Sequence, residues 1–211
     1  MSQNRTVQLI FQSVYVAFGV LAVFASVGLF NASPYTSFYV KFTNLSNYFC
    51  LAVMVAELVQ TAGRTADGRV TRWPLAKFLG VLAILLTFLV FNIMLMPAQS
   101  LEKSLKVESI LCHQVLPVMF VLDWALFYRH GDIKASWPVI SAAVVLLYVA
   151  FVYLRAALLG FAGDDLYPYF FLNLDTQGVF GVVGWVSVLA AAFVAVGYGF
   201  LALDHRASRM A

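Results

Sequence analysis

Residues 79–95 read LGVLAILLTFLVFNIML, and this run decides the class of fold. It is apolar on every side of a helix and lacks the alternation of polar and apolar residues that strands of membrane β-barrels show. A helix needs roughly 20 mostly apolar residues to cross the hydrocarbon core of a bilayer. The run therefore predicts a membrane-spanning helix, whose backbone polar groups are bonded within the helix itself.

The rest of the chain has the same character. Of its 211 residues, 63% are hydrophobic and 11% are charged, and the mean hydropathy is +0.88, whereas about 25% of a soluble domain is charged. The sequence predicts an all-α, polytopic membrane bundle of six transmembrane helices that forms a single domain over residues 1–211. The predicted spans lie near residues 7–30, 38–61, 74–97, 109–128, 136–158 and 179–203. MSQNRTVQ runs directly into an apolar stretch that is too long for a cleaved signal peptide, so we expect the first helix to stay in the protein.

The basic residues predict the orientation of the helices. If six helices alternate in direction, one side of the membrane receives Arg5, Arg64, Arg69, Arg72, Lys77, Arg129, Lys134, Arg206 and Arg209. The positive-inside rule makes this side cytoplasmic. Both termini are then cytoplasmic, and the loops at 98–108 and 160–178 are external. The net charge of +3 follows from this topology and does not indicate nucleic-acid binding, which requires a concentrated basic face.

A polar stripe runs along the second predicted helix. Its members follow one another at the spacing of a single helix face: Thr43, Ser46, Asn47, Cys50, Met54 and Glu57. An unpaired polar group in hydrocarbon costs several kcal/mol, so the stripe should point into the bundle. One interpretation is that these small polar residues bind helices to each other, and the other is that they line a functional site.

His113 favours the second interpretation, because it is the only histidine predicted inside the membrane and ionisable residues there are commonly functional. Thr43 and His113 each lie four or five residues inside the outer end of their helices, which is roughly 7 Å at the rise of an α-helix. Asn92 and Arg155 also fall near the outer ends of their helices. Four helices thus bring polar groups to one level.

Hydroxyl and imidazole groups at one level predict nucleophilic catalysis. A threonine hydroxyl needs a neighbouring base, and a neutral imidazole suits that role near pH 7, so Thr43 and His113 form a candidate catalytic pair. The candidate donors to a developing oxyanion are Asn44, Asn47, Asn92 and Gln114. Arg155 or Lys41 could hold a substrate carboxylate. A structural role for His113, bonded to a neighbouring helix, stays open.

Other sites are not favoured by the sequence. A zinc site needs three or four ligands, and the outer polar layer offers one histidine and one adjacent cysteine, so no metal and no other cofactor is expected. Glu57 and Asp123 lie toward the cytoplasmic ends of their helices and are predicted to be structural, paired with each other or with Arg129. His130 and His205 fall in cytoplasmic segments without visible partners.

Three motifs carry a resemblance to a known family. They are FTNLSN at 42–47, the H-x-x-x-P-x-x-x-x-x-D-W pattern formed by His113, Pro117, Asp123 and Trp124, and YPYFFLN at 167–173. Together they resemble the bacterial six-helix family called Pr-six-Pr, which implies a multi-pass protein of the bacterial inner membrane. That family is distantly similar to the eukaryotic androgen-induced and ADTRP membrane proteins, which hydrolyse fatty acid esters of hydroxy fatty acids with a threonine and a histidine.

By motif position, the resemblance implies that the threonine is Thr43 and the histidine is His113. The chain departs from the eukaryotic branch at two places. Thr43 is followed by the polar sequence Asn-Leu-Ser-Asn, and Asn173 stands where an acid is expected. Two function classes remain. The first is an intramembrane lipid-ester hydrolase whose partners are membrane lipids and a lipid-like substrate. The second is a non-catalytic transporter or a lipid- or ligand-binding protein.

Overall fold

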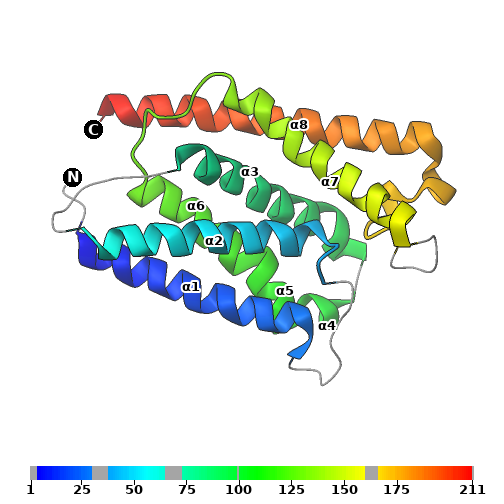
Figure 1. The fold of residues 1–211 in the computed structure, drawn as a ribbon, viewed down its shortest axis with the longest axis horizontal. Helices are drawn as coiled ribbons and strands as arrows, with labels where there is room; N and C mark the ends of the chain where they lie inside the picture. The colour runs from blue at the N-terminus through cyan, green and yellow to red at the C-terminus, as the bar shows by residue number, and fades with distance from the viewer. Residues whose placement is uncertain (1–3, 30–37, 65–72, 99, 160–165, 211) are drawn as a thin grey trace. The chain divides into compact units, whose positions relative to one another are not determined.

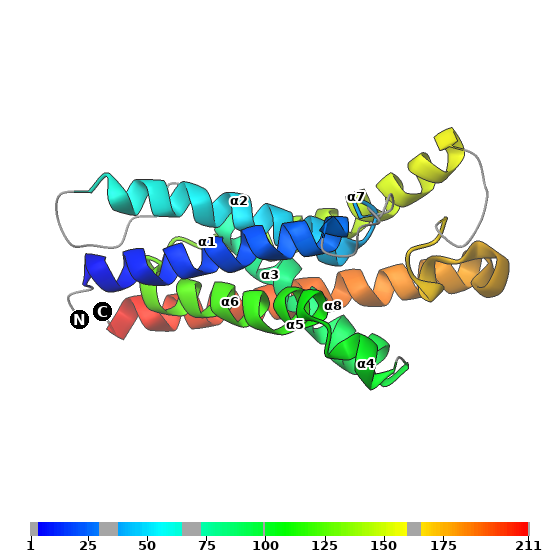
Figure 2. The same ribbon diagram turned by 90° about the horizontal axis from the view of Figure 1, so that it is seen from below.

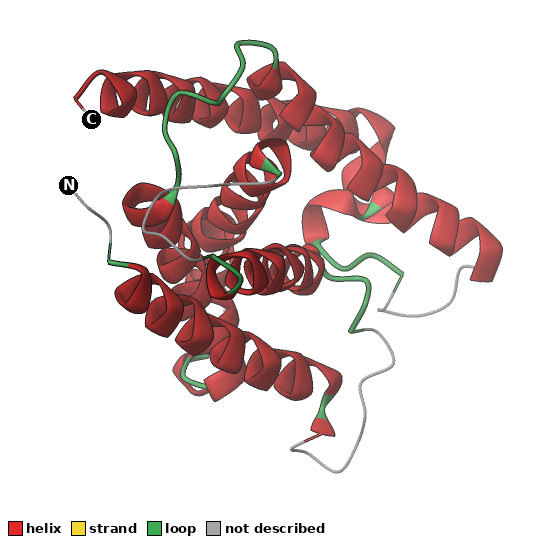
Figure 3. Cartoon of the chain, turned by 60° about the vertical axis from the view of Figure 1, so that its left-hand side comes forward, coloured by secondary structure: helices red, strands yellow, loops and turns green. Residues whose placement is uncertain are grey.

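The computed structural model of the protein describes residues 4–29, 38–64, 73–98, 100–159 and 166–210. Regular structure within these residues is helical throughout (Figure 3). Six helices are long and apolar enough to cross a membrane: Arg5–Val27, Phe42–Ala62, Pro74–Leu95, Val107–Phe127, Trp137–Leu158 and Leu174–Met210. The all-α, six-helix prediction is confirmed, and the chain is a multi-pass membrane protein. Its direction across the membrane stays a prediction.

Two of the spans are built from several helical segments. α1 (Arg5–Val27) and α2 (Phe42–Ala62) are continuous. The third span joins α3 (Pro74–Val90) to the π-helical turn η2 (Phe91–Leu95) and the short η3 (Met96–Ala98). After α4 (Leu101–Ser104), the fourth span consists of α5 (Val107–Ile110), the π-helical turn η4 (Leu111–Val115) and α6 (Leu116–Phe127). Each π turn inserts an extra residue into its helix, a feature that is frequent at functional sites.

The ends of α1 and α3 follow from local sequence. The side chain of Asn4 accepts a hydrogen bond from the backbone N–H of Thr6 at 2.9 Å and so caps the first turn of α1. Gly28 ends α1 with φ 83°, a left-handed conformation that glycine adopts at little cost. α3 begins with Pro74, whose missing N–H is harmless in the first turn of a helix.

The first compact unit comprises the described residues up to Ile133 and from Asp204 onward. In it, α1 packs against α2 and α6, and α3 packs against the same two helices (Figure 1 and Figure 2). The four helices enclose an interior that includes the buried rings of Tyr15, Phe78 and Phe120. Gly80 permits this packing, because a Cβ there would meet the Phe120 ring at 3.0 Å. We call the end of these helices where α1 begins the basic end, and the opposite end the histidine end.

The second compact unit comprises residues 134–203. It contains α7 (Trp137–Leu159), the short η5 (Phe170–Leu172) and most of α8 (Leu174–Met210). Of the six spans, only this last helix is much longer than predicted, because the prediction of 179–203 followed the apolar residues alone. After residue 203 the sequence becomes polar, but no glycine or proline ends the helix before Met210. Near its start, Gly178 has non-helical torsions, φ 63° and ψ 171°, so the helix is kinked there.

The YPYFFL run packs inside the second unit. Tyr169 stacks on Phe171 with ring centroids 5.1 Å apart, and Phe170 meets Trp185 edge-on at 5.9 Å. The hydroxyl of Tyr153 donates to the carbonyl of Leu172 at 2.7 Å. These contacts give the run a packing role within the second unit.

Asn173, which stands where the resemblance has an acid, caps the start of α8. Its Oδ1 accepts from the backbone N–H groups of Asp175 at 2.9 Å and Thr176 at 3.3 Å. An amide suits this capping position as well as a carboxylate does. The departure at Asn173 is therefore compatible with a purely structural use of that position.

Large apolar side chains cover the outer surface of all six spans. One example from each span is more than 40% exposed: Ile10, Val59, Ile93, Val118, Leu147 and Val179. In water such a surface would drive aggregation, whereas in a bilayer it contacts lipid tails. Contact with membrane lipids thus follows from the fold.

Asp204, near the end of α8, is fully buried in the first unit. Its carboxylate accepts from the backbone N–H groups of Gly131 at 2.9 Å and Ile133 at 3.0 Å, and it lies 3.1 Å from Nδ1 of His130. The expectation that His130 has no partner is therefore wrong, because the partner comes from a helix 74 residues away in sequence. The prediction of one domain for the whole chain stays a prediction, since the chain divides into two compact units.

Candidate functional site

The polar stripe of α2 faces the interior of the first unit, as predicted. All of its members are buried: Thr43, Ser46, Asn47, Cys50, Met54 and Glu57. Ser46 bonds to the hydroxyl of Thr87 on α3 at 2.8 Å, and the thiol of Cys50 donates to the carbonyl of Gly80 at 3.4 Å. Part of the stripe thus binds α2 to α3, which is the structural role that such residues commonly have.

His113 lies in the π turn η4, half-buried, with one ring nitrogen fixed by its own helix. Its Nδ1 is 2.9 Å from the backbone carbonyl oxygen of Ser109. A carbonyl oxygen only accepts, so Nδ1 carries the proton and Nε2 carries the lone pair. Within the described part of the chain, Nε2 forms no hydrogen bond. The imidazole is therefore held in the tautomer that a general base requires.

Phe91 holds the imidazole from the other side. The two rings are stacked, with centroids 3.7 Å apart and planes inclined by 14°. Phe91 is the first residue of η2, so the π turns of the third and fourth spans meet at this stack. A second contact joins the same turns, because Nε2 of Gln114 donates to Oδ1 of Asn92 at 2.8 Å. Asn92 in turn donates to the carbonyl of Phe88 at 2.7 Å.

Asn47 connects α2 to this layer. Its Nδ2 donates to the carbonyl of Thr43 at 2.8 Å and to the carbonyl of Cys112, the residue before His113, at 3.1 Å. Both partners are acceptors, so the amide orientation is fixed. Oδ1 of Asn47 is then a buried acceptor without a partner among the described residues. Such a group is costly unless it receives a hydrogen bond, for example from water or a bound molecule.

The structure brings most of the predicted site residues together at the histidine end. Thr43 and Asn47 lie one turn apart on α2, and Asn47 bonds the segment that carries His113. Asn44 is buried, and its amide donates to the carbonyl of Phe38 at 2.8 Å. Lys41 is exposed at the N-cap position of α2. Among the described residues, His113 bonds Ser109 and makes no hydrogen bond to Thr43, so the pairing of the Thr43 hydroxyl with the imidazole stays a prediction.

Arg155 belongs to the second unit, where it lies half-buried on α7. Its predicted role as a carboxylate-binding residue of the same site stays a prediction. Sequence reasoning also missed the two residues that position the imidazole, Ser109 and Phe91. The spacing of Ser109 and His113, four residues apart on one helix face, was the available signal for the first of them.

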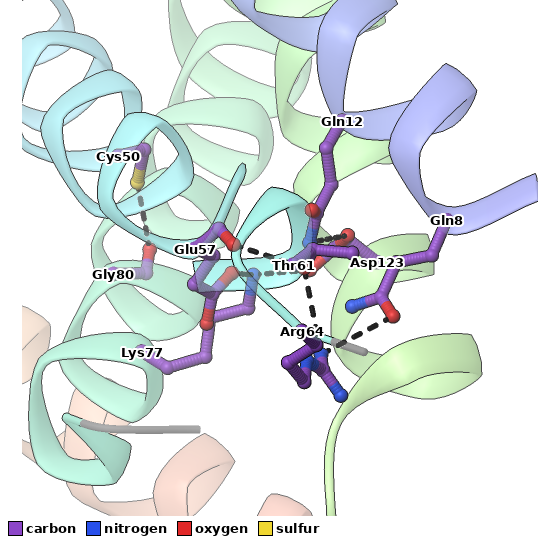
Figure 4. A network of polar contacts seen from close by, with 9 residues as sticks. All are labelled: Gln8, Gln12, Cys50, Glu57, Thr61, Arg64, Lys77, Gly80 and Asp123. Atoms are coloured by element: carbon purple, nitrogen blue, oxygen red, sulfur yellow. Dashed lines mark hydrogen bonds and ion pairs between the residues drawn. The ribbon is translucent and has the colours of Figure 1, made fainter. Parts of the chain in front are cut away.

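A second polar cluster lies at the basic end of the same unit, and the sequence predicted its two carboxylates as a structural pair but missed the lysine between them (Figure 4). Lys77 of α3 is fully buried, with Nζ 2.8 Å from Oε2 of Glu57 and 2.5 Å from Oδ2 of Asp123. Glu57 and Asp123 are therefore structural partners of Lys77. The sequence had placed Lys77 among the charges that face the cytoplasm and had assigned Arg129 as a candidate partner.

Comparisons with protein-family models, with curated proteins and with solved structures found no match to this chain. The resemblance to the Pr-six-Pr family stays a prediction that rests on the three motifs. The chemical argument at the histidine end stands apart from it, because that argument uses only the contacts of this chain.

Proposed function

We propose that this protein hydrolyses lipid esters within the membrane, with Thr43 as the nucleophile and His113 as the base. The tautomer of His113 carries the proposal. The Ser109 carbonyl accepts a hydrogen bond from Nδ1–H and the Phe91 ring packs on the imidazole, which leaves the lone pair of Nε2 available in a polar layer that α2 also lines. The one hydrogen-bonded nitrogen of His113 bonds within its own span and does not join that span to another.

The reaction follows from these groups. Nε2 of His113 accepts the hydroxyl proton of Thr43 while Oγ1 attacks the ester carbonyl carbon. The protonated imidazole then gives this proton to the leaving alcohol, and an acyl group remains on Thr43. A water molecule, deprotonated by the same nitrogen, attacks the acyl group, the bond to Oγ1 breaks, and the imidazolium returns the proton to Oγ1 of Thr43 as the fatty acid leaves. The candidate donors to the oxyanion are the second N–H hydrogens of Asn44, Asn92 and Gln114. Asn47, predicted as a further donor, has both of its N–H hydrogens bonded to carbonyls.

The substrate class follows from the surroundings and from the resemblance. The site lies inside a membrane-spanning bundle, so a substrate with long apolar chains reaches it from the lipid phase. Fatty acid esters of hydroxy fatty acids have such chains and a free carboxylate. Lys41, exposed beside the start of α2, is the candidate cation for that carboxylate.

Hydrolysis by the purified protein in lipid or detergent tests the proposal. We expect Thr43→Ala and His113→Ala each to lower turnover by about 10²-fold or more, with no additional loss in the double variant. Thr43→Ser should retain part of the activity because the hydroxyl survives. Thr87→Ala is the matched control, because it removes another buried threonine hydroxyl of the same unit and should leave turnover intact.

Mass spectrometry supplies a second measurement. During turnover, an acyl group should accumulate on Thr43 and should be missing in the Thr43→Ala variant. A wild-type protein that cleaves neither branched fatty-acid esters, simple esters nor lysolipids would overturn the proposal. Equal turnover of wild type and Thr43→Ala would do the same.

The alternative is a non-catalytic transporter or a lipid- or ligand-binding protein. The buried charges at the basic end favour it, because a hydrolase site at the histidine end makes no use of them. Uptake of a labelled lipid or solute by vesicles containing the protein, with no chemical change in that molecule, would support this alternative.

A further inference from the structure

The cluster at the basic end holds three ionisable side chains from three helices. Glu57 comes from α2, Lys77 from α3 and Asp123 from α6, and the Lys77 ammonium contacts both carboxylates (Figure 4). The side chains of Lys77, Glu57 and Asp123 are 1%, 10% and 3% exposed. All three lie within predicted and observed membrane spans, about one turn from the helix ends.

The charges of this cluster do not balance. Two carboxylates and one ammonium leave one excess negative charge when all three are ionised. Three further titratable groups near the cluster are ordinarily neutral: Tyr15 of α1, Cys50 of α2 and Tyr128 after α6. The guanidinium of Arg64 lies against Thr61 and Gln8, closer to the helix ends. An uncompensated charge inside a membrane bundle is very costly, so the cluster needs one more positive charge.

The hydrogen bonds of the cluster show the same deficit. Gln12 is 1% exposed, and its Nε2 points to Oδ1 of Asp123 at 3.4 Å. The amide must be oriented this way because a carboxylate accepts and cannot donate. Oε1 of Gln12 is then a buried acceptor beside the cluster, without a partner among the described residues. Acceptors thus exceed donors, and an additional proton would supply a donor.

Aromatic contacts close the cluster on the side toward the histidine end. Nζ of Lys77 lies 4.0 Å from the centroid of the Phe120 ring, and the Tyr15 ring packs against the same ring at 5.8 Å. The hydroxyl of Tyr15 is buried and has no partner in the described part of the chain. The Lys77 ammonium thus has three neighbours, the two carboxylates and the face of the Phe120 ring.

Toward the basic end, polar groups continue to the helix ends. The hydroxyl of Thr61, one turn beyond Glu57, lies 3.5 Å from the guanidinium of Arg64, which also lies 3.5 Å from Oε1 of Gln8 (Figure 4). Arg5 donates to the carbonyls of Thr61 at 3.0 Å and Ala62 at 2.6 Å. The hydroxyl of Thr61 also donates to the backbone carbonyl of Glu57 at 2.9 Å, so polar side chains continue from the cluster toward the basic end.

We propose that Glu57, Lys77 and Asp123 form a proton-binding site, in which one proton is shared by the two carboxyl groups. The bound proton makes the cluster neutral and supplies the missing donor. Its source is the aqueous phase at the basic end. The site is separate from the ester-hydrolysis site and does not depend on it. Binding of the proton makes the stability of the protein depend on pH.

Infrared spectroscopy of the protein in lipid tests this directly, because a neutral carboxyl group has a carbonyl stretch that an ionised carboxylate lacks. At neutral pH we expect one such band in the wild type and its loss in both Glu57→Gln and Asp123→Asn. Lys77→Met should roughly double the band, because both carboxyl groups must then be neutral. Asp175→Asn, at an exposed carboxyl, is the matched control and should keep the wild-type band.

Thermal unfolding against pH gives a second readout. The folded wild type holds one proton more than the unfolded chain at neutral pH, so its stability should fall as the pH rises from about 4, where the carboxyl groups of the unfolded chain ionise, through neutrality. This fall should vanish in Glu57→Gln and in Asp123→Asn, whose clusters are neutral without the extra proton. The control Asp175→Asn should show the wild-type dependence.

Three results would overturn the proposal. The first is a wild type without a neutral carboxyl band whose unfolding temperature does not depend on sodium concentration, which would mean that a guanidinium such as that of Arg64 supplies the missing charge. The second is survival of the band in both Glu57→Gln and Asp123→Asn. The third is a wild type without the band whose unfolding temperature rises with sodium concentration, which would identify a sodium ion as the occupant.

Discussion

The two ends of the first unit solve the problem of burying polar groups in different ways. At the histidine end, the groups are neutral and mostly bond to backbone carbonyls, as His113 does to Ser109 and Asn47 does to Cys112. At the basic end, the groups are charged and bond to each other, with Lys77 at the centre. A side chain that bonds the backbone through one atom, as His113 does, keeps its other polar atom available to a ligand. The ammonium and carboxylates of an ion pair bind each other instead. The difference favours a reactive site at the first end and a charge-storing site at the second.

Removal of the central ammonium should have the largest effect on stability. Lys77→Met removes the cation between two buried carboxyl groups, which must then both take up protons to stay buried, and we expect it to lower the free energy of unfolding by about 3–5 kcal/mol at neutral pH. Part of this loss should return at acidic pH, where protonating the two carboxyl groups costs less. Thermal unfolding in detergent measures it, with the exposed Lys134→Met as the control. An unchanged wild-type stability in Lys77→Met would remove the distinction between the two ends.

At the histidine end, the loss of Asn47 should be smaller. Asn47→Ala removes the donor to the carbonyls of Thr43 and Cys112, which leaves buried acceptors unpaired and should cost about 1–3 kcal/mol. Asn44→Ala is the matched comparison on the same helix, because it removes a single bond to Phe38. Equal losses in the two variants would show that the bond to Cys112 contributes nothing to stability.

A double-mutant cycle on Asn92 and Gln114 isolates the amide bond between the two π turns. The bond is 2.8 Å long and half-buried, so we expect a coupling free energy of about 0.5–1.5 kcal/mol. Chemical or thermal unfolding of the two single variants and the double variant supplies the numbers. Additive losses would mean that the turns are held by the stack of Phe91 on His113 alone.

The smallest effect should come from the hydroxyl that only joins helices. Ser46→Ala removes a bond of 2.8 Å to Thr87 and should cost about 0.6 kcal/mol, the average for polar contacts between membrane helices. Ester hydrolysis should be unchanged in the same variant. A loss of turnover comparable to that of Thr43→Ala would extend the site one turn further along α2.

Much of the fold was predictable because hydropathy alone places membrane spans. The six predicted spans overlap the six observed ones, and the buried face of α2 follows from the spacing of Thr43, Ser46, Asn47 and Cys50. Both are local properties of the sequence. A residue's own neighbours along the helix determine them, and no knowledge of the other helices is needed.

The missed features depend on other helices. Lys77 lies only four residues inside its helix, where a lysine ordinarily extends its ammonium toward water. It turns inward here because two carboxylates from α2 and α6 meet it, and those partners are 20 and 46 residues away in sequence. The π turns at Phe91 and Leu111 have no marker residue, since an inserted residue in a helix is set by packing. The partner of His130 was missed for the same reason.

The bonds of Asp204 have a consequence for the order of events during synthesis. The backbone N–H groups of Gly131 and Ile133 receive their acceptor from a residue that is made 73 and 71 positions later. Until α8 has been completed, the loop after α6 has unfilled donors, although all four helices of the first unit are already in the membrane. Two backbone donors of the first unit are thus satisfied only after Asp204 has been made.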